Sequence, residues 1–411
     1  MIEEGLLRQL AQTHEGSMYL FDVGKLKERV SYLKSHIMQK TNLCYAVKAN
    51  TFLIGALKND VERFEACSPG EARICMQSGV TFEKMVISGV YKTPSFIKEW
   101  MFESGGAGIY TAESKKQVKL LAKVAEEQKK RVKVLLRLTS GNQFGMDKPQ
   151  LFEIIKERYA YPQLDFIGIQ YFSGTQKQSV KRLKRELDGL CDIAKALWQE
   201  ENFFTRELEF GPGFPFCYFG EEFDEEGFLD EFAKISQQTG ERLSCECKGD
   251  VQLTLELGRS IAASCGTYLT RVVDVKENKG QHYAIIDGGI HQIAYYGQMM
   301  AMKQPVLHVI GNSKENESEL CEKDDTLWNI CGSLCTGNDI LAKQMLLPSL
   351  KEGTLLAFSN AGAYCVTEGI SLFLSRSLPH VFLICEDGTV LHVRDEVQTQ
   401  NLNSANLHLD R

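Results

Sequence analysis

Eight short apolar runs alternate with segments of helical periodicity along roughly the first two thirds of the chain. The runs are interpreted as strands at 43–47, 62–66, 85–88, 107–110, 132–138, 164–171, 207–211 and 252–256. Helical spacing of apolar residues is clearest in 113–129 and 176–201. Strands that alternate with helices predict a parallel sheet, and eight such units fit a closed (β/α)8 barrel. A doubly wound open sheet is the alternative.

A second kind of pattern begins after Arg259. Alternating segments typical of antiparallel strands follow it, at 267–275, 282–286, 354–358, 381–385 and 389–393. One further apolar run, 18–22, is expected to join them. The 411 residues also exceed the roughly 250–300 that one core accommodates. We therefore expect a barrel at 24–260 and a β-rich domain formed by 1–23 and 261–411.

Composition excludes several classes of protein. The net charge of −7 argues against a nucleic-acid partner, and no apolar run has the length of a membrane span. The chain has thirteen cysteines, no C-x-x-C pair and a polar, acidic start. This pattern predicts a reduced, cytoplasmic protein without a disulfide framework. No histidine lies between His36 and His282, so a site in the barrel must work without imidazole and without a histidine-bound metal.

Charged residues and glycines stand at the ends of the expected strands, where barrels of this type carry their active sites. They are Lys48, Arg137, Gly211, Gly213, Glu256, Gly258 and Arg259. A desolvated lysine can form a Schiff base, although a solvated surface lysine is the alternative. The glycine-rich segment after 207–211 could cradle a phosphate or simply make a turn. A Schiff-base lysine, a phosphate cradle and a buried carboxylate are what pyridoxal phosphate requires.

The chain resembles the fold-type III pyridoxal-phosphate decarboxylases, which include ornithine, arginine and diaminopimelate decarboxylases. The resemblance extends from about residue 17 to residue 395. It rests on YAVKAN (45–50), FEACSPGEA (64–72), GIQYFSGTQ (168–176), EFGPGF (209–214), LELGR (255–259), GSLCTGND (332–339) and AGAYCVTEG (361–369). It implies a barrel of the alanine-racemase type, followed by an antiparallel β-rich domain that completes the active site of the partner in a homodimer.

The same resemblance assigns roles. Lys48 would form the internal aldimine with the cofactor, and Glu256 would pair with the pyridine nitrogen. Cys335 would enter the neighbouring subunit's site as a catalytic residue. The remaining cofactor-binding residues would be Glu65, Arg137, Phe172, Gly211, Gly213, Gly258, Arg259 and Tyr364. Cys335 could instead be a small buried hydrophobe, and Tyr364 could be a core residue.

Departures from the family pattern concern the substrate. Phe172 stands where a stacking histidine is usual, and it keeps an aromatic face without a charge. Thr336 replaces the acidic residue that pairs with the distal amino group of a diamino acid. Thr336 and Asp339 are the expected substrate-binding residues, although Asp339 could equally cap a loop. The run at 287–300 is closer to the branch that acts on conjugated or carrier-protein-bound amino acids.

The expected reaction is decarboxylation of an L-amino acid or an amino-acid conjugate, through an external aldimine and a quinonoid. Glu256 would keep the ring nitrogen protonated, and either Cys335 of the partner or Lys48 would return a proton to the α-carbon. Two alternatives remain. One is a racemase, which would place an arginine rather than Glu256 at the ring nitrogen. The other is an inactive regulatory homologue, which would be expected to lose Lys48.

Overall fold

The computed structural model describes residues 2–37, 41–247, 249–295, 300–311 and 325–405. The chain divides into two compact units. The barrel unit contains Lys27–Phe216 and Phe223–Ile261, and the β-rich unit contains Met1–Leu26, Cys217–Glu222 and Ala262–Arg411. Among the described residues, no helix combines the length and the apolar composition that a membrane span requires.

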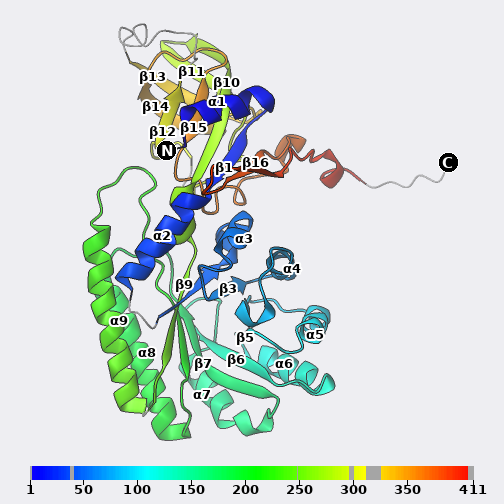
Figure 1. Ribbon diagram of the computed structural model, residues 1–411, viewed down its shortest axis with the longest axis vertical. Helices are drawn as coiled ribbons and strands as arrows, with labels where there is room; N and C mark the ends of the chain where they lie inside the picture. Colours follow the sequence, from blue (N-terminus) through cyan, green and yellow to red (C-terminus); the bar gives the residue numbers. More distant parts are fainter. Residues whose placement is uncertain (1, 38–40, 248, 296–299, 312–324, 406–411) are drawn as a thin grey trace, which may run out of the picture. The chain divides into compact units, whose positions relative to one another are not determined.

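Eight parallel strands close the barrel of the first unit (Figure 1). They are β2 (Asn42–Ala46), β3 (Arg63–Ala66), β4 (Met85–Ile87), β5 (Ile109–Ala112), β6 (Val132–Leu138), β7 (Leu164–Phe172), β8 (Glu207–Gly211) and β9 (Gln252–Leu257). Cys44, Val86, Ile109, Leu135 and Ile167 form one apolar cluster from five of these strands. The predicted barrel is therefore confirmed, and the open sheet is excluded.

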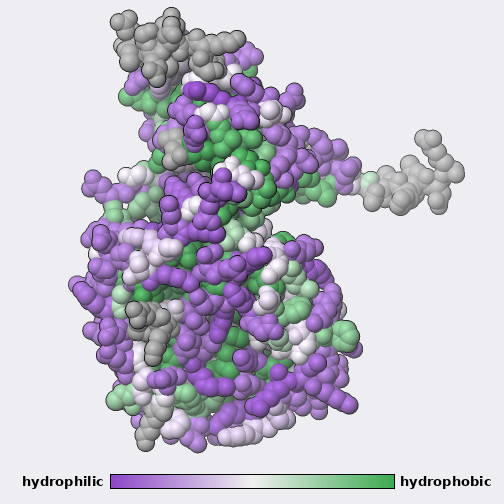
Figure 2. Space-filling view, in the orientation of Figure 1, coloured by the Kyte–Doolittle hydropathy of each residue, from purple (hydrophilic) through white to green (hydrophobic). Residues whose placement is uncertain are grey.

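Within the ranges given above, nine α-helices accompany the barrel strands. They are α2 (Val23–His36), α3 (Ile54–Leu57), α4 (Pro69–Gln77), α5 (Pro94–Glu103), α6 (Lys115–Glu127), α7 (Lys148–Lys156), α8 (Val180–Glu201), α9 (Glu225–Cys247) and α10 (Arg259–Ala262). Five of them, α4 to α8, begin at a side-chain N-cap. The side chains of Ser68, Thr93, Ser114, Asp147 and Ser179 each accept a hydrogen bond from a backbone N–H of the first turn. Such caps end the strand-to-helix loops at defined positions. The face of the unit seen in Figure 2 is mostly hydrophilic.

The β-rich unit is a mixed, mostly antiparallel sheet. Its path runs β14 (Ile340–Leu347), β13 (Thr326–Cys331), β11 (Gln281–Ile286), β10 (Gly266–Asn278), β1 (Met18–Asp22), β16 (His380–Ile384) and β17 (Val390–Arg394). Off this path, β15 (Leu355–Phe358) pairs with β10 and with β12 (Leu307–Ile310). The expected antiparallel β-rich domain is therefore confirmed, with two parallel pairs, β1–β16 and β11–β13, within it.

The first helix, α1 (Glu4–Thr13), packs its apolar stripe onto this sheet. Leu7 and Leu10 belong to one buried cluster with Met18 and Leu20 of β1 and Phe382 of β16. The run at 18–22 therefore joins the β-rich unit, as its apolar character suggested. Parallel pairing of β1 with β16 is possible because the two strands lie far apart in the sequence.

Candidate active site

Lys48 lies between two carboxylates at the carboxyl end of the barrel strands. Its Nζ is 3.1 Å from Oε2 of Glu65 on β3 and 3.2 Å from Oε1 of Glu256 on β9. The strand order explains this meeting, because β2 pairs with both β3 and β9. The carboxylate side chains are 1% and 7% exposed, whereas the lysine side chain is 42% exposed. The amine thus faces an opening while its counter-charges lie in the barrel interior.

The two carboxyl groups have different proton affinities. Burial raises the pKa of Glu256 to about 7, and the negative charge of Glu65 adds to the effect. Burial would also raise the pKa of Glu65. That effect is outweighed by the charge of Lys48, a hydrogen bond with Glu256 and the charge of Arg137. Together they hold the pKa of Glu65 below its usual range. Near neutral pH, Glu65 is therefore ionised and Glu256 carries a proton for part of the time.

A buried polar chain continues from Glu65 into the barrel. Gln170 Nε2 donates to Glu65 Oε1 at 3.2 Å and to Glu209 Oε1 at 2.6 Å. Burial, reinforced by the charges of Glu207, Glu256 and Glu65, raises the pKa of Glu209 well above its usual value. Arg63 forms its close ion pair with Glu207 instead. Glu209 is therefore held as a neutral acid.

Arg137, expected to bind the cofactor, is engaged by its neighbours. Its Nη1 lies 3.3 Å from Glu113 Oε1, and its guanidinium stands 4.9 Å from the centre of the Phe144 ring. Glu113 Oε2 accepts the N–H of Gly145. Arg137 thus lies at the end of β6 in a fixed orientation and contributes positive charge near Glu65.

The glycines predicted to cradle a phosphate lie where other atoms approach their Cα closely, backbone at Gly213 and side chains at Gly211 and Gly258. A Cβ on Gly213, whose φ is +59°, would lie 2.1 Å from the carbonyl oxygen of Gly174. A Cβ on Gly211 would lie 2.5 Å from the ring of Phe172. A Cβ on Gly258 would lie 2.9 Å from Cβ of Ala49. Arg259 Nε bonds Thr175 Oγ1 at 3.3 Å.

A network of ion pairs around the buried Lys177 anchors the segment that carries Phe172. Lys177 Nζ lies 2.8 Å from Glu186 Oε2 and bonds Ser173 Oγ at 2.9 Å. Glu186 Oε1 accepts from Ser173 Oγ at 2.6 Å and from Arg182 Nε at 3.1 Å. The network ties 172–177 to the start of α8 and thereby restricts the position of the Phe172 ring.

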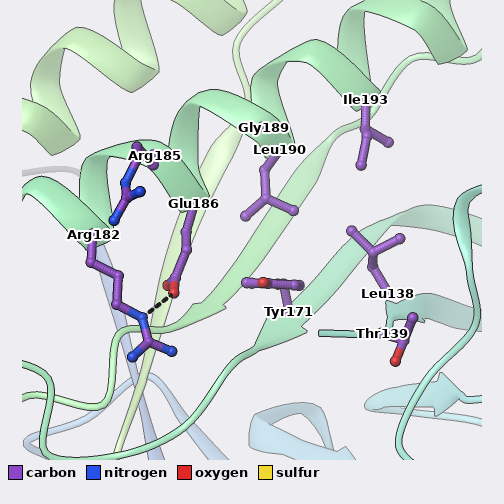
Figure 3. A pocket seen from close by; sticks show the side chains of 9 residues that line it. All are labelled: Leu138, Thr139, Tyr171, Arg182, Arg185, Glu186, Gly189, Leu190 and Ile193. Atoms are coloured by element: carbon purple, nitrogen blue, oxygen red, sulfur yellow. Dashed lines mark hydrogen bonds and ion pairs between the residues drawn. The ribbon is translucent and has the colours of Figure 1, made fainter. Parts of the chain in front are cut away.

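A groove of about 650 Å³ lies beside this network (Figure 3). Its lining comprises Leu138, Thr139, Tyr171, Arg182, Arg185, Glu186, Gly189, Leu190 and Ile193. The side chains from α8 face Tyr171 and the end of β6, with the Arg182–Glu186 pair at one end. The groove is lined by none of the residues predicted to bind cofactor or substrate.

The other predicted site residues belong to the β-rich unit. Cys335 is exposed and Thr336 half-buried in the turn between β13 and β14. Tyr364 is half-buried with φ +67°, and its carbonyl accepts the N–H groups of Thr367 and Glu368. Residues 296–299 of the run at 287–300 lie outside the described residues.

Asp339 has the geometry of a capping residue. Its side chain is buried, Oδ1 accepts from the N–H of Ile290 at 2.8 Å, and Oδ2 accepts from the N–H of Leu334 at 2.7 Å. Both oxygens are therefore engaged by backbone. This favours the capping alternative over direct contact with substrate and makes Asp339 a positioning residue for Cys335 and Thr336.

Sequence reasoning missed Gln170, Glu209, Glu113 and Lys92. Lys92 is 7% exposed, and its Nζ donates to Gly89 O at 2.7 Å and to Gln117 Oε1 at 3.2 Å. Burial lowers its pKa to about 8. The pattern ELEFG carried a readable signal for Glu209, because two acidic residues alternate with apolar ones along a buried strand.

The residues of the barrel unit fit pyridoxal phosphate. An amine flanked by buried carboxylates suits an aldehyde on a cationic ring. The Phe172 ring beside Gly211 and the Gly174 carbonyl beside Gly213 leave room for no larger side chain. Lys48 would hold the aldehyde carbon. Glu256 would face the ring nitrogen, and the glycine segment with Arg259 would hold the phosphate.

Comparisons with known proteins identify the family of the chain. A family model described as pyridoxal-dependent decarboxylase, C-terminal sheet domain, matches residues 18–362. The chain is 24% identical to L-glutamyl-[BtrI acyl-carrier protein] decarboxylase of Niallia circulans, over 99% of this chain and 98% of that protein. It is also 24% identical to a Staphylococcus aureus protein, 2-[(L-alanin-3-ylcarbamoyl)methyl]-2-hydroxybutanedioate decarboxylase, over 94% and 98%.

Solved structures share the fold. Diaminopimelate decarboxylase from Helicobacter pylori, complexed with L-lysine, superposes with a TM-score of 0.81 at 21% identity, covering 96% of this chain and 98% of that one.

Proposed function

This chain belongs to the pyridoxal-dependent decarboxylase family, and from that premise we propose that it acts on an amino acid whose distal end carries no ammonium group. An amide, a thioester or a larger conjugate meets this description. The observation that carries the proposal is Thr336, a half-buried hydroxyl in the segment that resembles the substrate-recognition turn of the family. A hydroxyl donates and accepts hydrogen bonds but does not neutralise an ammonium group.

The reaction class itself follows from family membership. The chain is a pyridoxal-phosphate-dependent amino-acid decarboxylase, a carboxy-lyase. The comparisons give no support to a racemase over a decarboxylase. Lys48 is present and lies between the carboxylates of Glu65 and Glu256, which argues against an inactive homologue.

Two relatives support a conjugated distal end without an ammonium group. The printed names of the Niallia circulans and Staphylococcus aureus proteins describe a carrier-bound glutamyl group and a conjugated alanine derivative. In both, the end of the amino acid remote from the α-carbon is joined to another group. We extend that substrate class, and not either substrate, to this chain.

Pyridoxal phosphate supplies an electron sink for the electron pair that remains on the α-carbon when carbon dioxide leaves. The chain's own residues would bind and orient the reactants. Lys48 would hold the cofactor and then release it to the substrate amine. Near pH 7, Glu65 is ionised and Glu256 is protonated for part of the time. A cation placed beside the two side chains would therefore favour the ionised form of Glu256. The pair thus stabilises positive charge at that position.

We also propose a homodimer with shared sites. Cys335 is exposed in the turn after β13, where it is available to a second subunit, and its thiol would deliver a proton to the α-carbon.

The twelve cysteines in the described part of the chain are all free thiols, which supports a cytoplasmic enzyme.

A carbon dioxide release assay tests the substrate proposal. The free diamino acids ornithine, lysine and diaminopimelate are compared with glutamyl and aspartyl compounds whose distal carboxyl is an amide or a thioester. Lys48→Ala provides the background rate. We expect faster release from the uncharged compounds, and efficient release from a free diamino acid would overturn the proposal.

A further inference from the structure

Three of the eight histidines of the chain meet in the β-rich unit. His14 follows α1, His380 is the first residue of β16, and His392 lies in β17. The ring centres are 5.3 Å apart for His14 and His380, 5.0 Å for His14 and His392, and 5.1 Å for His380 and His392. The decarboxylase site uses none of these residues.

Strand pairing produces this cluster. β16 and β17 are antiparallel, with an irregularity between Val381 and Phe382, and Phe382 is paired with His392. The rings of that pair stack, with centres 4.3 Å apart and planes 14° apart. His380 lies two residues before Phe382, on the same face of the strand. The side chains of His380 and His392 therefore converge.

The nitrogen atoms lie at separations that a single ion could span. His380 Nδ1 is 3.1 Å from His392 Nε2. Asp395 follows β17, and its Oδ1 is 3.4 Å from Nδ1 of His392, the other nitrogen of that ring, so an ion on Nε2 requires the Asp395 side chain to turn toward it. One ligand atom from each of these three residues lies within 4.8 Å of the others. Metal–ligand bonds of 2.0–2.2 Å in a tetrahedral site place ligand atoms roughly 3.3 Å apart.

We propose that His380, His392 and Asp395 form a binding site for a divalent transition-metal ion such as Zn²⁺ or Ni²⁺. Two imidazoles and a carboxylate suit these ions rather than Mg²⁺ or Ca²⁺, which prefer oxygen ligands. The side chain of Asp395 is 86% exposed, so it can turn toward an ion with little loss of packing. The remaining coordination positions would be taken by water.

The charges around the cluster permit a cation. The guanidinium of Arg394, on the same strand as His392, donates to the carbonyl of Pro379 at 2.9 Å. An ion on Nδ1 of His380 would displace the N–H of Glu396, now 3.1 Å away. That amide lies in an exposed segment where water can replace its acceptor.

Isothermal titration of the full-length holoenzyme with NiCl2 tests the site. Ni²⁺ is the probe because free thiols are abundant in the chain and would compete for Zn²⁺. The variants are His380→Gln and His392→Gln. The matched control is His308→Gln, which changes a half-buried histidine of β12 in the same unit.

We expect one Ni²⁺ per chain in the wild type and in His308→Gln, with affinity at least about tenfold weaker in each of the other two variants. Ni²⁺ should also raise the unfolding temperature of the wild type and of the control but not of the two variants, since an ion bound to the native state stabilises it. Absence of Ni²⁺ binding by the wild type, or equal affinity in His380→Gln and His392→Gln, would overturn the proposal. The pair would then be joined by a hydrogen bond alone.

Discussion

Gln170 Nε2 donates a 2.6 Å hydrogen bond to Glu209 Oε1 in the interior of the barrel, where both side chains are buried. Gln170 Oε1 and Glu209 Oε2 have no hydrogen-bond partner within the described ranges of the chain. A neutral acid at this position avoids adding one more negative charge to the buried glutamates around it.

Protonation of Glu209 makes stability depend on pH. The folded chain keeps this proton, whereas the unfolded chain releases it above the ordinary pKa of 4.5. The unfolded state then binds fewer protons, so this residue's contribution to the free energy of unfolding falls as pH rises above 4.5. This decline in the free energy of unfolding amounts to roughly 1 kcal/mol per pH unit, and we expect it to be absent from Glu209→Gln. Urea denaturation at pH 5, 6, 7 and 8 measures it. The exposed Glu83→Gln is the control, and parallel pH profiles for wild type and Glu209→Gln would refute the assignment.

Lys48→Ala should fold and lose the cofactor. One partly exposed side chain contributes little to the core, and the carboxyl groups of Glu65 and Glu256 can take up protons when their cation is removed. Covalent retention of the cofactor through dialysis should disappear, and turnover should fall by roughly a thousandfold or more. The exposed Lys116→Ala is the control. Wild-type turnover and retention in Lys48→Ala would contradict the site.

Gly213→Ala should damage both the fold and cofactor retention. The new Cβ would meet the carbonyl oxygen of Gly174 in a left-handed backbone conformation, with an expected loss of about 2–4 kcal/mol of unfolding free energy. Gly141→Ala is the matched control, since its φ is +95° and no atom lies within 4 Å of the new Cβ. It should cost only about 1–2 kcal/mol and leave cofactor retention unchanged. Equal losses in both variants would show that the close approach at Gly213 is unimportant.

Mixing two inactive proteins tests the shared site. If Cys335 serves the partner's barrel, hybrids of Lys48→Ala and Cys335→Ala chains contain one intact site and one doubly altered site. Random exchange should restore about a quarter of the wild-type activity. Mass spectrometry of the mixture verifies subunit exchange. If exchange is complete and activity stays at the level of the parents, each chain builds its own site.

Thr336→Asp should shift substrate preference toward free diamino acids. A carboxylate would neutralise the distal ammonium, which otherwise enters the site without a counter-charge. Activity on ornithine or lysine should rise by up to roughly tenfold for each 1.4 kcal/mol of pairing recovered. Thr336→Ser is the conservative control. A folded, cofactor-loaded Thr336→Asp enzyme with unchanged preference would show that this position does not face the substrate.

The barrel could be predicted from the sequence because each strand and helix is a local signal. The run at 207–211 coincides with β8, and 252–256 ends one residue before β9 does. The run at 107–110 was placed two residues early, since Ala107 belongs to a turn in which its N–H bonds the carbonyl of Ser104. Lys48, Glu65 and Glu256 meet because β2 lies between β3 and β9, whereas the sequence indicated Glu65 only through the family resemblance.

The β-rich unit was harder to predict because its pairings are distant. β12, β13 and β14 were missed, and β14 carries exposed Lys343 and Gln344 in its middle, which interrupts the alternation. The parallel pairs β1–β16 and β11–β13 depend on long-range packing. The partner of a buried acid, such as Gln170 for Glu209, likewise depends on which strands become neighbours.

The chain passes between the two units at four places, after residues 26, 216, 222 and 261. The barrel is consequently encoded in two separate stretches of the gene, interrupted by six codons that belong to the other unit. Neither unit can be exchanged between homologues, or expressed alone, by a single cut. A recombinant barrel requires a linker in place of Cys217–Glu222, and recombination during evolution would have had to transfer both units together.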